Sequence, residues 1–61
     1  MTEAQKEFID YIERVIRNSP LDYNEAFHKA LEEAAVREVG KSYGLSEFEI
    51  SQCGMYTKAT Q

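Results

Sequence analysis

Residues that cross-link a chain or bind metals are scarce in this 61-residue sequence. It contains one cysteine, Cys53, one histidine, His28, one proline and no tryptophan. One cysteine excludes a disulfide within the chain. A structural zinc ion needs four ligands that are mostly cysteine or histidine, and this chain has too few of them. A domain this small has only marginal stability, so self-association is the expected way to bury more surface.

Long apolar runs are also missing. No stretch approaches the roughly 20 apolar residues that a membrane-spanning helix requires. Residues 1–6 do not show the basic start and apolar run of a signal peptide. A lone thiol without an export signal is typical of a reducing compartment. We therefore expect a cytoplasmic protein without membrane contact.

The motifs of catalytic and nucleotide-binding sites are missing too. The glycines do not form either of the spacings that cradle phosphate groups. No pattern orients His28 as a general base or activates Cys53 as a nucleophile. Glu32 and Glu33 are neighbours, and on a helix their side chains would point about 100° apart. We therefore expect no enzymatic activity, no metal, no cofactor and no small-molecule substrate.

Basic residues are few where acidic residues are many. The net charge is −4, and the segment from Asp22 to Glu49 contains seven acidic residues and only three Lys or Arg. Attraction to nucleic acid usually depends on Lys and Arg displacing counterions, so it should be weak here. An acidic domain meets basic protein surfaces more readily. The surplus of acid also has a simpler explanation, which is solubility.

The apolar residues that are present follow a helical pattern from the start of the chain. Thr2 and Gln5 form a capping box, and the following spacing predicts a helix over residues 3–18. Its apolar face consists of Ala4, Phe8, Ile9, Tyr11, Ile12, Val15 and Ile16. Ile9 and Ile16 lie at the far edge of this wide face from Tyr11. One neighbouring helix should not cover the whole face, which favours a homodimer or a partner.

A second helix is predicted over residues 22–43, after a turn at residues 18–22. Either Ser19 or Asp22 is the N-cap, and the helix ends at Gly40 or continues to Tyr43 with Gly44 in the left-handed conformation. Its core stripe consists of Tyr23, Ala26, Phe27, Ala30, Leu31 and Ala34. With the first helix it should form an antiparallel helical hairpin.

A short third helix is predicted over residues 46–53. Ser46 and Glu49 form a capping box, and Leu45 with Ile50 forms a hydrophobic staple. Gly54 should end this helix. The sequence thus predicts an all-α fold with a single three-helix domain at residues 1–54 and a flexible tail at residues 55–61.

One helical face of the second helix carries a cluster of carboxylates. The residues are Asp22, Glu25, Glu32 and Glu33, interrupted by Lys29. They are candidates for a protein-binding surface, together with Ile9 and Ile16 of the first helix. The alternative is a solvated face joined by i,i+4 pairs such as Glu25–Lys29 and Glu33–Arg37.

Residues 36–53 resemble a helix-turn-helix segment of the phage-repressor kind. Gly40 stands where that family has a small residue at the helix crossing, Gly44 at the turn and Leu45 at the apolar plug. The resemblance implies DNA reading by Ser46, Glu47, Phe48, Ser51 and Gln52. These positions include no base and one acid, and no Lys or Arg occurs between Lys41 and Lys58.

Two functional hypotheses follow, and the first is preferred. In the first, the chain is a small acidic regulator that inhibits or adapts a larger protein by occupying its surface. Small acidic helical inhibitors of phage or mobile-element origin, including anti-CRISPR-type proteins, are similar in size and charge. In the second, it is a helix-turn-helix transcriptional regulator that binds DNA as a dimer. An oligomerisation module without further activity is a third reading.

Overall fold

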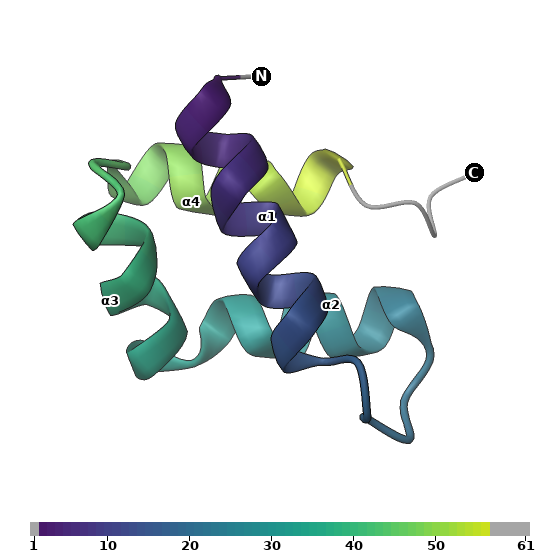
Figure 1. Cartoon of the computed structure of the whole chain (residues 1–61). Coiled ribbons are helices and arrows are strands. Elements are labelled where there is room, and N and C mark those ends of the chain that lie inside the picture. Colours follow the sequence, from purple (N-terminus) through teal and green to yellow (C-terminus); the bar gives the residue numbers. More distant parts are fainter. Residues whose placement is uncertain (1, 57–61) are drawn as a thin grey trace.

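Four α-helices and one short 3₁₀ helix make up the described part of the chain (Figure 1). The structure is a computed structural model, and it describes residues 2–56. The elements in chain order are α1 (Glu3–Val15), α2 (Tyr23–Glu32), α3 (Ala34–Ser42), α4 (Glu47–Cys53) and the 3₁₀ helix η1 (Gly54–Tyr56). The predicted all-α fold class is confirmed.

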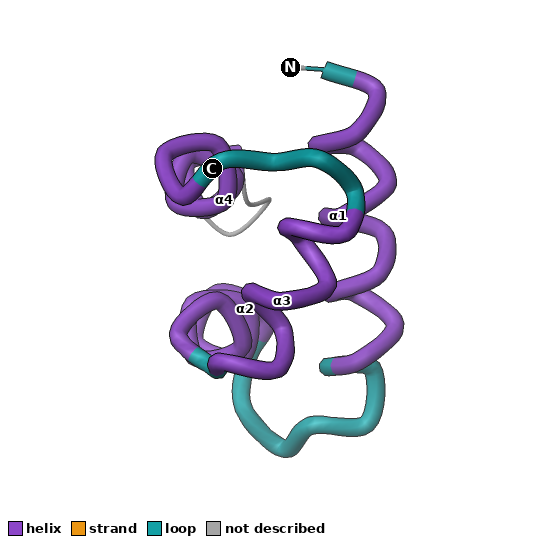
Figure 2. Tube along the Cα trace, turned by 90° about the vertical axis from the view of Figure 1, so that its left-hand side faces the viewer, coloured by secondary structure: helices purple, strands orange, loops and turns teal. Residues whose placement is uncertain are grey.

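Helix α1 lies across the other helices. In Figure 1 it passes in front of α2 and α4, and α3 joins these two at one side. Figure 2, turned by 90°, shows α2 and α4 nearly end-on while α1 runs lengthwise beside them. Helix α1 contacts α2, α3 and α4. It therefore forms one layer, and the other three helices form the second.

The predicted continuous helix over residues 22–43 is wrong. Its path breaks at Glu33, whose backbone is extended with φ −75° and ψ 130°, so α2 and α3 are separate helices. Arg37 stabilises the break, because its guanidinium donates a hydrogen bond of 2.8 Å to the Leu31 carbonyl in the last turn of α2. The change of direction lets Val36 and Gly40 of α3 reach the core.

The predicted antiparallel hairpin is also wrong, because α2 crosses α1 instead of running back along it (Figures 1 and 2). Phe27 and Leu31 of α2 pack into the same cluster as Phe8 and Ile12 of α1. Helices α3 and α4 also pack against α1, so α2 covers only part of the apolar face of α1. The core is thus shared by four short helices.

The helix starts follow the capping residues. Thr2 and Gln5 form the predicted capping box of α1. Of the two candidate caps for α2, Asp22 is the one used, and its carboxylate accepts from the Glu25 amide at 2.9 Å. Ser46 and Glu49 form the predicted box of α4. Helix α1 ends three residues before its predicted end, and residues 16–18 form a turn.

Helix α3 ends in a Schellman motif. The Leu45 amide donates to the Gly40 carbonyl at 3.2 Å, and the Gly44 amide donates to the Lys41 carbonyl at 2.9 Å. Gly44 has a φ of 89°, a left-handed conformation that favours glycine. The chain then turns directly into α4, with Leu45 buried beneath the turn.

The buried side chains form one cluster to which α1, α2, α3, the α3–α4 turn and α4 all contribute. Its members are Phe8, Ile12, Phe27, Ala30, Leu31, Val36, Leu45, Ile50 and Cys53. Ile9 and Ile16, the predicted far edge of α1, are partly buried and pack against this cluster. The fold itself therefore covers much of the wide apolar face of α1.

Candidate interaction surfaces

Helix α4 has two faces of opposite character. Ile50 and Cys53 point into the core and are fully buried. On the other side Phe48 is 72% exposed, and Met55, seven residues later in η1, is 75% exposed. We call the exposed side chains of α4 and the adjoining η1 the exposed α4 face, and its residues are Phe48, Ser51 and Met55.

The charges at the start of α4 are internally paired. The Glu47 carboxylate receives hydrogen bonds from Arg37 at 2.7 Å and from Lys41 at 2.8 Å, both of which lie on α3. These bonds, with the attraction of the two cations, lower the pKa of Glu47 to about 2. The hydrogen bond to Glu47 likewise raises the pKa of Lys41. Both basic residues nearest the start of α4 are therefore partly neutralised.

The polar residues of α4 also have partners within the chain. Gln52 accepts a hydrogen bond of 3.2 Å from Gln5, which also donates to the Glu49 carbonyl at 3.2 Å. Ser51 accepts from Arg37 at 3.4 Å. Ser46 is the helix cap. Of the five residues to which the resemblance assigns DNA reading, the four polar ones thus have hydrogen-bond partners within the chain. The fifth, Phe48, has an apolar side chain.

The four acidic residues predicted as a protein-binding surface are all exposed, but two lie at each end of α2. The Asp22 carboxylate is used as the N-cap. Glu32 is the last residue of α2, and Glu33 lies at the break before α3. Helix α2 has 10 residues, so about 15 Å separate its ends. Arg37, the sequence partner expected for Glu33, bonds to Leu31 and Glu47 instead.

A groove of about 390 Å³ opens beside α2. It lies between the end of α1, the α1–α2 loop, α2 and the start of α3. Its lining residues are Val15, Ile16, Ser19, Pro20, Leu21, Ala26, Lys29, Ala30, Glu33 and Val36. The structure thus brings Ile16 and Glu33, predicted from two different helices, to one surface. Ile9 is not among the lining residues.

The residues with catalytic potential lie apart from this groove. Cys53 is buried, and burial together with the charge of Glu49 raises its thiol pKa to about 11. His28 is exposed, and its ring lies edge-on to the ring of Phe27. Within residues 2–56, no three His, Cys, Asp or Glu side chains gather in a way that would hold a metal ion.

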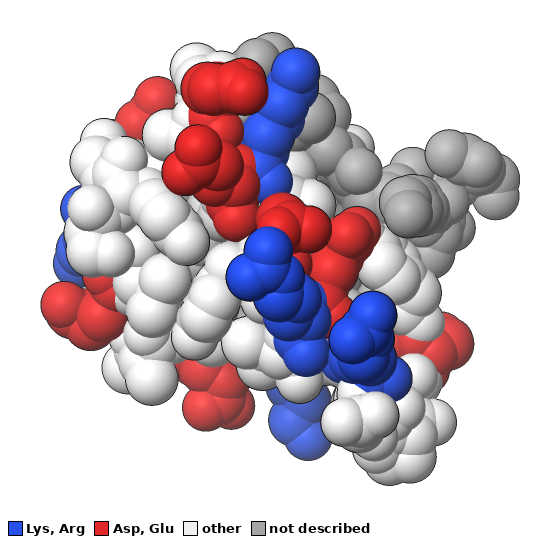
Figure 3. Space-filling view, viewed as in Figure 1, with Lys and Arg blue, Asp and Glu red and all other residues white. Residues whose placement is uncertain are grey.

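Charges of both signs are mixed over the α1 side of the molecule. Figure 3 shows acidic and basic side chains next to each other on this face. Asp10 and Arg14 form an i,i+4 ion pair at 2.6 Å. Phosphate backbones bind surfaces where Lys and Arg predominate, and this face carries charges of both signs.

Comparisons with known proteins yielded no relative. No family model, no curated protein and no solved structure matches this chain at a significant level. Among the helices at residues 3–56, none combines the length and apolar character needed to cross a membrane.

Sequence reasoning missed Met55 and the groove. Met55 was assigned to the tail, yet it lies in η1, which contacts α2 and α4. The groove had no local signal, because its walls come from four separate segments.

Proposed function

We propose that this chain is a small acidic regulator that binds a larger protein through the exposed α4 face. By occupying a surface of the partner, the chain would either inhibit it or act as an adaptor that links it to another protein. The observation that carries the proposal is the exposure of Phe48 and Met55, at 72% and 75%. Large apolar side chains with this degree of exposure are candidates for a binding site. Aromatic residues and methionine are enriched in protein interfaces.

The charge around this face favours a protein partner over nucleic acid. Glu47 and Glu49 lie on α4, and the two bases beside Glu47 are paired with it. A duplex would therefore meet acidic groups where phosphates need Lys and Arg. A partner with an apolar pocket and a basic rim is complementary to Phe48 and its acidic neighbours.

Affinity enrichment with quantitative mass spectrometry tests the proposal. Wild-type protein is compared with the Phe48→Ser/Met55→Ser variant, both immobilised at equal density. We expect the variant to lose the enriched partner, while Leu21→Ser, an exposed apolar control away from α4, retains it. A partner captured equally by all three proteins would refute binding through the exposed α4 face.

The acidic residues of α2 are a second candidate contact for the same partner. Glu25 and Glu32 are exposed and seven residues apart, so they lie on one side of α2. Charge reversal at both positions tests them directly. Unchanged partner binding by Glu25→Lys/Glu32→Lys would exclude this surface.

DNA binding is the second candidate function. The geometry that favours it is the short α3 of 9 residues, the glycine turn and a capped α4 whose Ser46 and Phe48 face solvent. The helix predicted over residues 22–43 is longer than the first helix of a helix-turn-helix, whereas the break at Glu33 leaves a short α3 before the turn. In this arrangement α4 would enter the major groove.

An NMR titration with a DNA duplex at low salt separates the two functions. DNA binding predicts shifts clustered at residues 46–53 that fade as salt is raised. Glu47→Gln should strengthen DNA binding by removing a negative charge, whereas it should weaken binding to a basic protein surface. No shifts at millimolar duplex would exclude the DNA-binding function.

A further inference from the structure

The groove beside α2 is apolar but incompletely covered. Val15 and Leu21 on its rim are 49% and 38% exposed, although both are aliphatic. Ile16 and Val36 also line it, and both belong to or pack against the core cluster. The groove is therefore an extension of the core to the surface, and a partner filling it would add apolar burial to a domain of marginal size.

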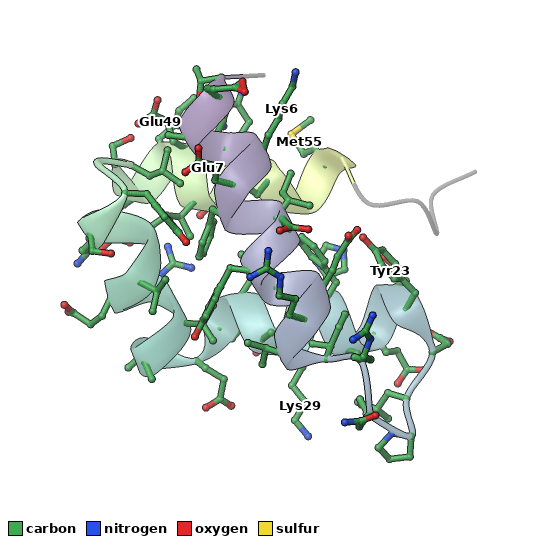
Figure 4. All side chains as sticks on the ribbon, viewed as in Figure 1. Lys6, Glu7, Tyr23, Lys29, Glu49 and Met55 are labelled. Carbon is green, nitrogen blue, oxygen red and sulfur yellow. The ribbon has the colours of Figure 1, made fainter. Side chains whose placement is uncertain are left out.

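Two charges of opposite sign border this apolar groove. Lys29 lies in the last turn of α2 and Glu33 is the residue that follows this helix, and both line the groove. Both side chains are exposed. Figure 4 shows Lys29 extending from α2 away from the body of the molecule. The occupant of the groove should thus present one acidic and one basic group with the same spacing.

We propose that the occupant is a second copy of this chain, related by a two-fold axis. In such an interface each residue i that contacts j is matched by j contacting i. If two α2 helices cross antiparallel on the groove side, with the axis midway between residues 29 and 33, Lys29 of one copy lies opposite Glu33 of the other. The ion pair then occurs twice. The surface is complementary to itself in charge, while Val15 and Leu21 lose their exposure.

Sedimentation equilibrium of the full chain tests this dimer. Wild-type protein should show twice the monomer mass of 7.0 kDa. Lys29→Glu and Glu33→Lys should each weaken the dimer about tenfold, because two ion pairs become two repulsive contacts. Both residues are exposed, and circular dichroism checks that each variant keeps its helices.

Mixing the two variants provides the decisive arm. A heterodimer of Lys29→Glu with Glu33→Lys has two attractive pairs, whereas each homodimer has two repulsive ones. The mixture should therefore regain wild-type affinity. Leu21→Ser should also weaken the dimer, whereas Phe48→Ser/Met55→Ser should leave it intact, because the exposed α4 face is not part of this groove.

Three results would overturn the proposal. The first is wild-type protein that remains monomeric at about 0.1 mM, a concentration on the order of the dissociation constant of a weak dimer. The second is a dimer that is indifferent to charge reversal at Lys29 and Glu33. The third is a mixture no tighter than either variant alone. None of these results bears on partner binding through the exposed α4 face, so the two proposals fail separately.

Discussion

Gly40 of α3 lies directly against Ile50 of α4. A Cβ atom at position 40 would be 2.9 Å from the Cδ1 and Cγ1 atoms of Ile50, and 3.0 Å from the Cζ atom of Phe8. Contacts under 3.0 Å require one of the groups to move. The absence of a side chain at Gly40 is therefore what lets α1, α3 and α4 meet at this point.

Gly40→Ala should destabilise the protein although alanine is the better helix former. Overpacking costs about 1–3 kcal/mol, and the gain in helix propensity offsets about 1 kcal/mol of that. We expect a net loss of up to about 2 kcal/mol in urea unfolding. Adding Ile50→Val, which removes Cδ1, should make the double variant lose less than the sum of the single changes. A Gly40→Ala variant that is more stable than wild type would contradict the close contact.

Gly44→Ala should be destabilising for a different reason. Nothing lies within 4 Å of a Cβ atom at this position, so the effect comes only from the backbone φ of 89°. We expect a loss of about 1–2 kcal/mol, measured by urea unfolding. Gly44→Asn should lose less, because asparagine tolerates the left-handed conformation better. Equal losses in both variants would show that the turn conformation is not the cause.

The contacts of Glu47 should make stability depend on pH in the acidic range. Hydrogen bonds from Lys41 and Arg37 lower its pKa from 4.5 to about 2 in the folded state. A lowered pKa contributes stability above pH 4.5, and this contribution is lost as the pH falls through about 2. Glu47→Gln should therefore unfold at lower urea than wild type at pH 7, and most of this difference should be gone at pH 2.

Two controls accompany this comparison. Glu7→Gln, an exposed glutamate of α1, should show a smaller difference from wild type. High salt should reduce the effect of Glu47→Gln, because both of its ion pairs are reachable by solvent. A difference between wild type and Glu47→Gln that is as large at pH 2 as at pH 7 would point to packing and not to charge.

Cys53 should react slowly with thiol reagents in the folded protein. Thiolate is the reactive form, and burial with the nearby Glu49 charge raises the thiol pKa to about 11. At pH 8 we expect labelling to be limited by opening of the α4–core contact, and to become fast in urea. Labelling of the folded protein at the rate of a free cysteine would contradict the burial of this side chain.

Local interactions in the sequence determined where the helices begin. The capping boxes of Thr2–Gln5 and Ser46–Glu49 involve residues three apart, so they form whatever surrounds them. The same holds for Gly44, whose conformation depends on its missing side chain. The apolar spacing likewise identified Phe8, Ile12 and Phe27 as core residues.

The break at Glu33 was decided by tertiary structure. The residues around it, Glu32 to Ala35, are good helix formers, so no local signal ends α2 there. Arg37 satisfies the Leu31 carbonyl, and the turned α3 places Gly40 against Ile50. Only these contacts between separate segments make two short helices more favourable than one long helix.

The candidate surfaces divide in the same way. The spacing of Phe48 and Met55 is present in the sequence, but their exposure depends on which side of α4 meets the core. The groove depends entirely on how α1 crosses α2, since Val15, Leu21 and Lys29 come together only in the folded chain. Short-range capping and periodicity are encoded residue by residue, whereas the choice of neighbour is made by the packing of all four helices at once.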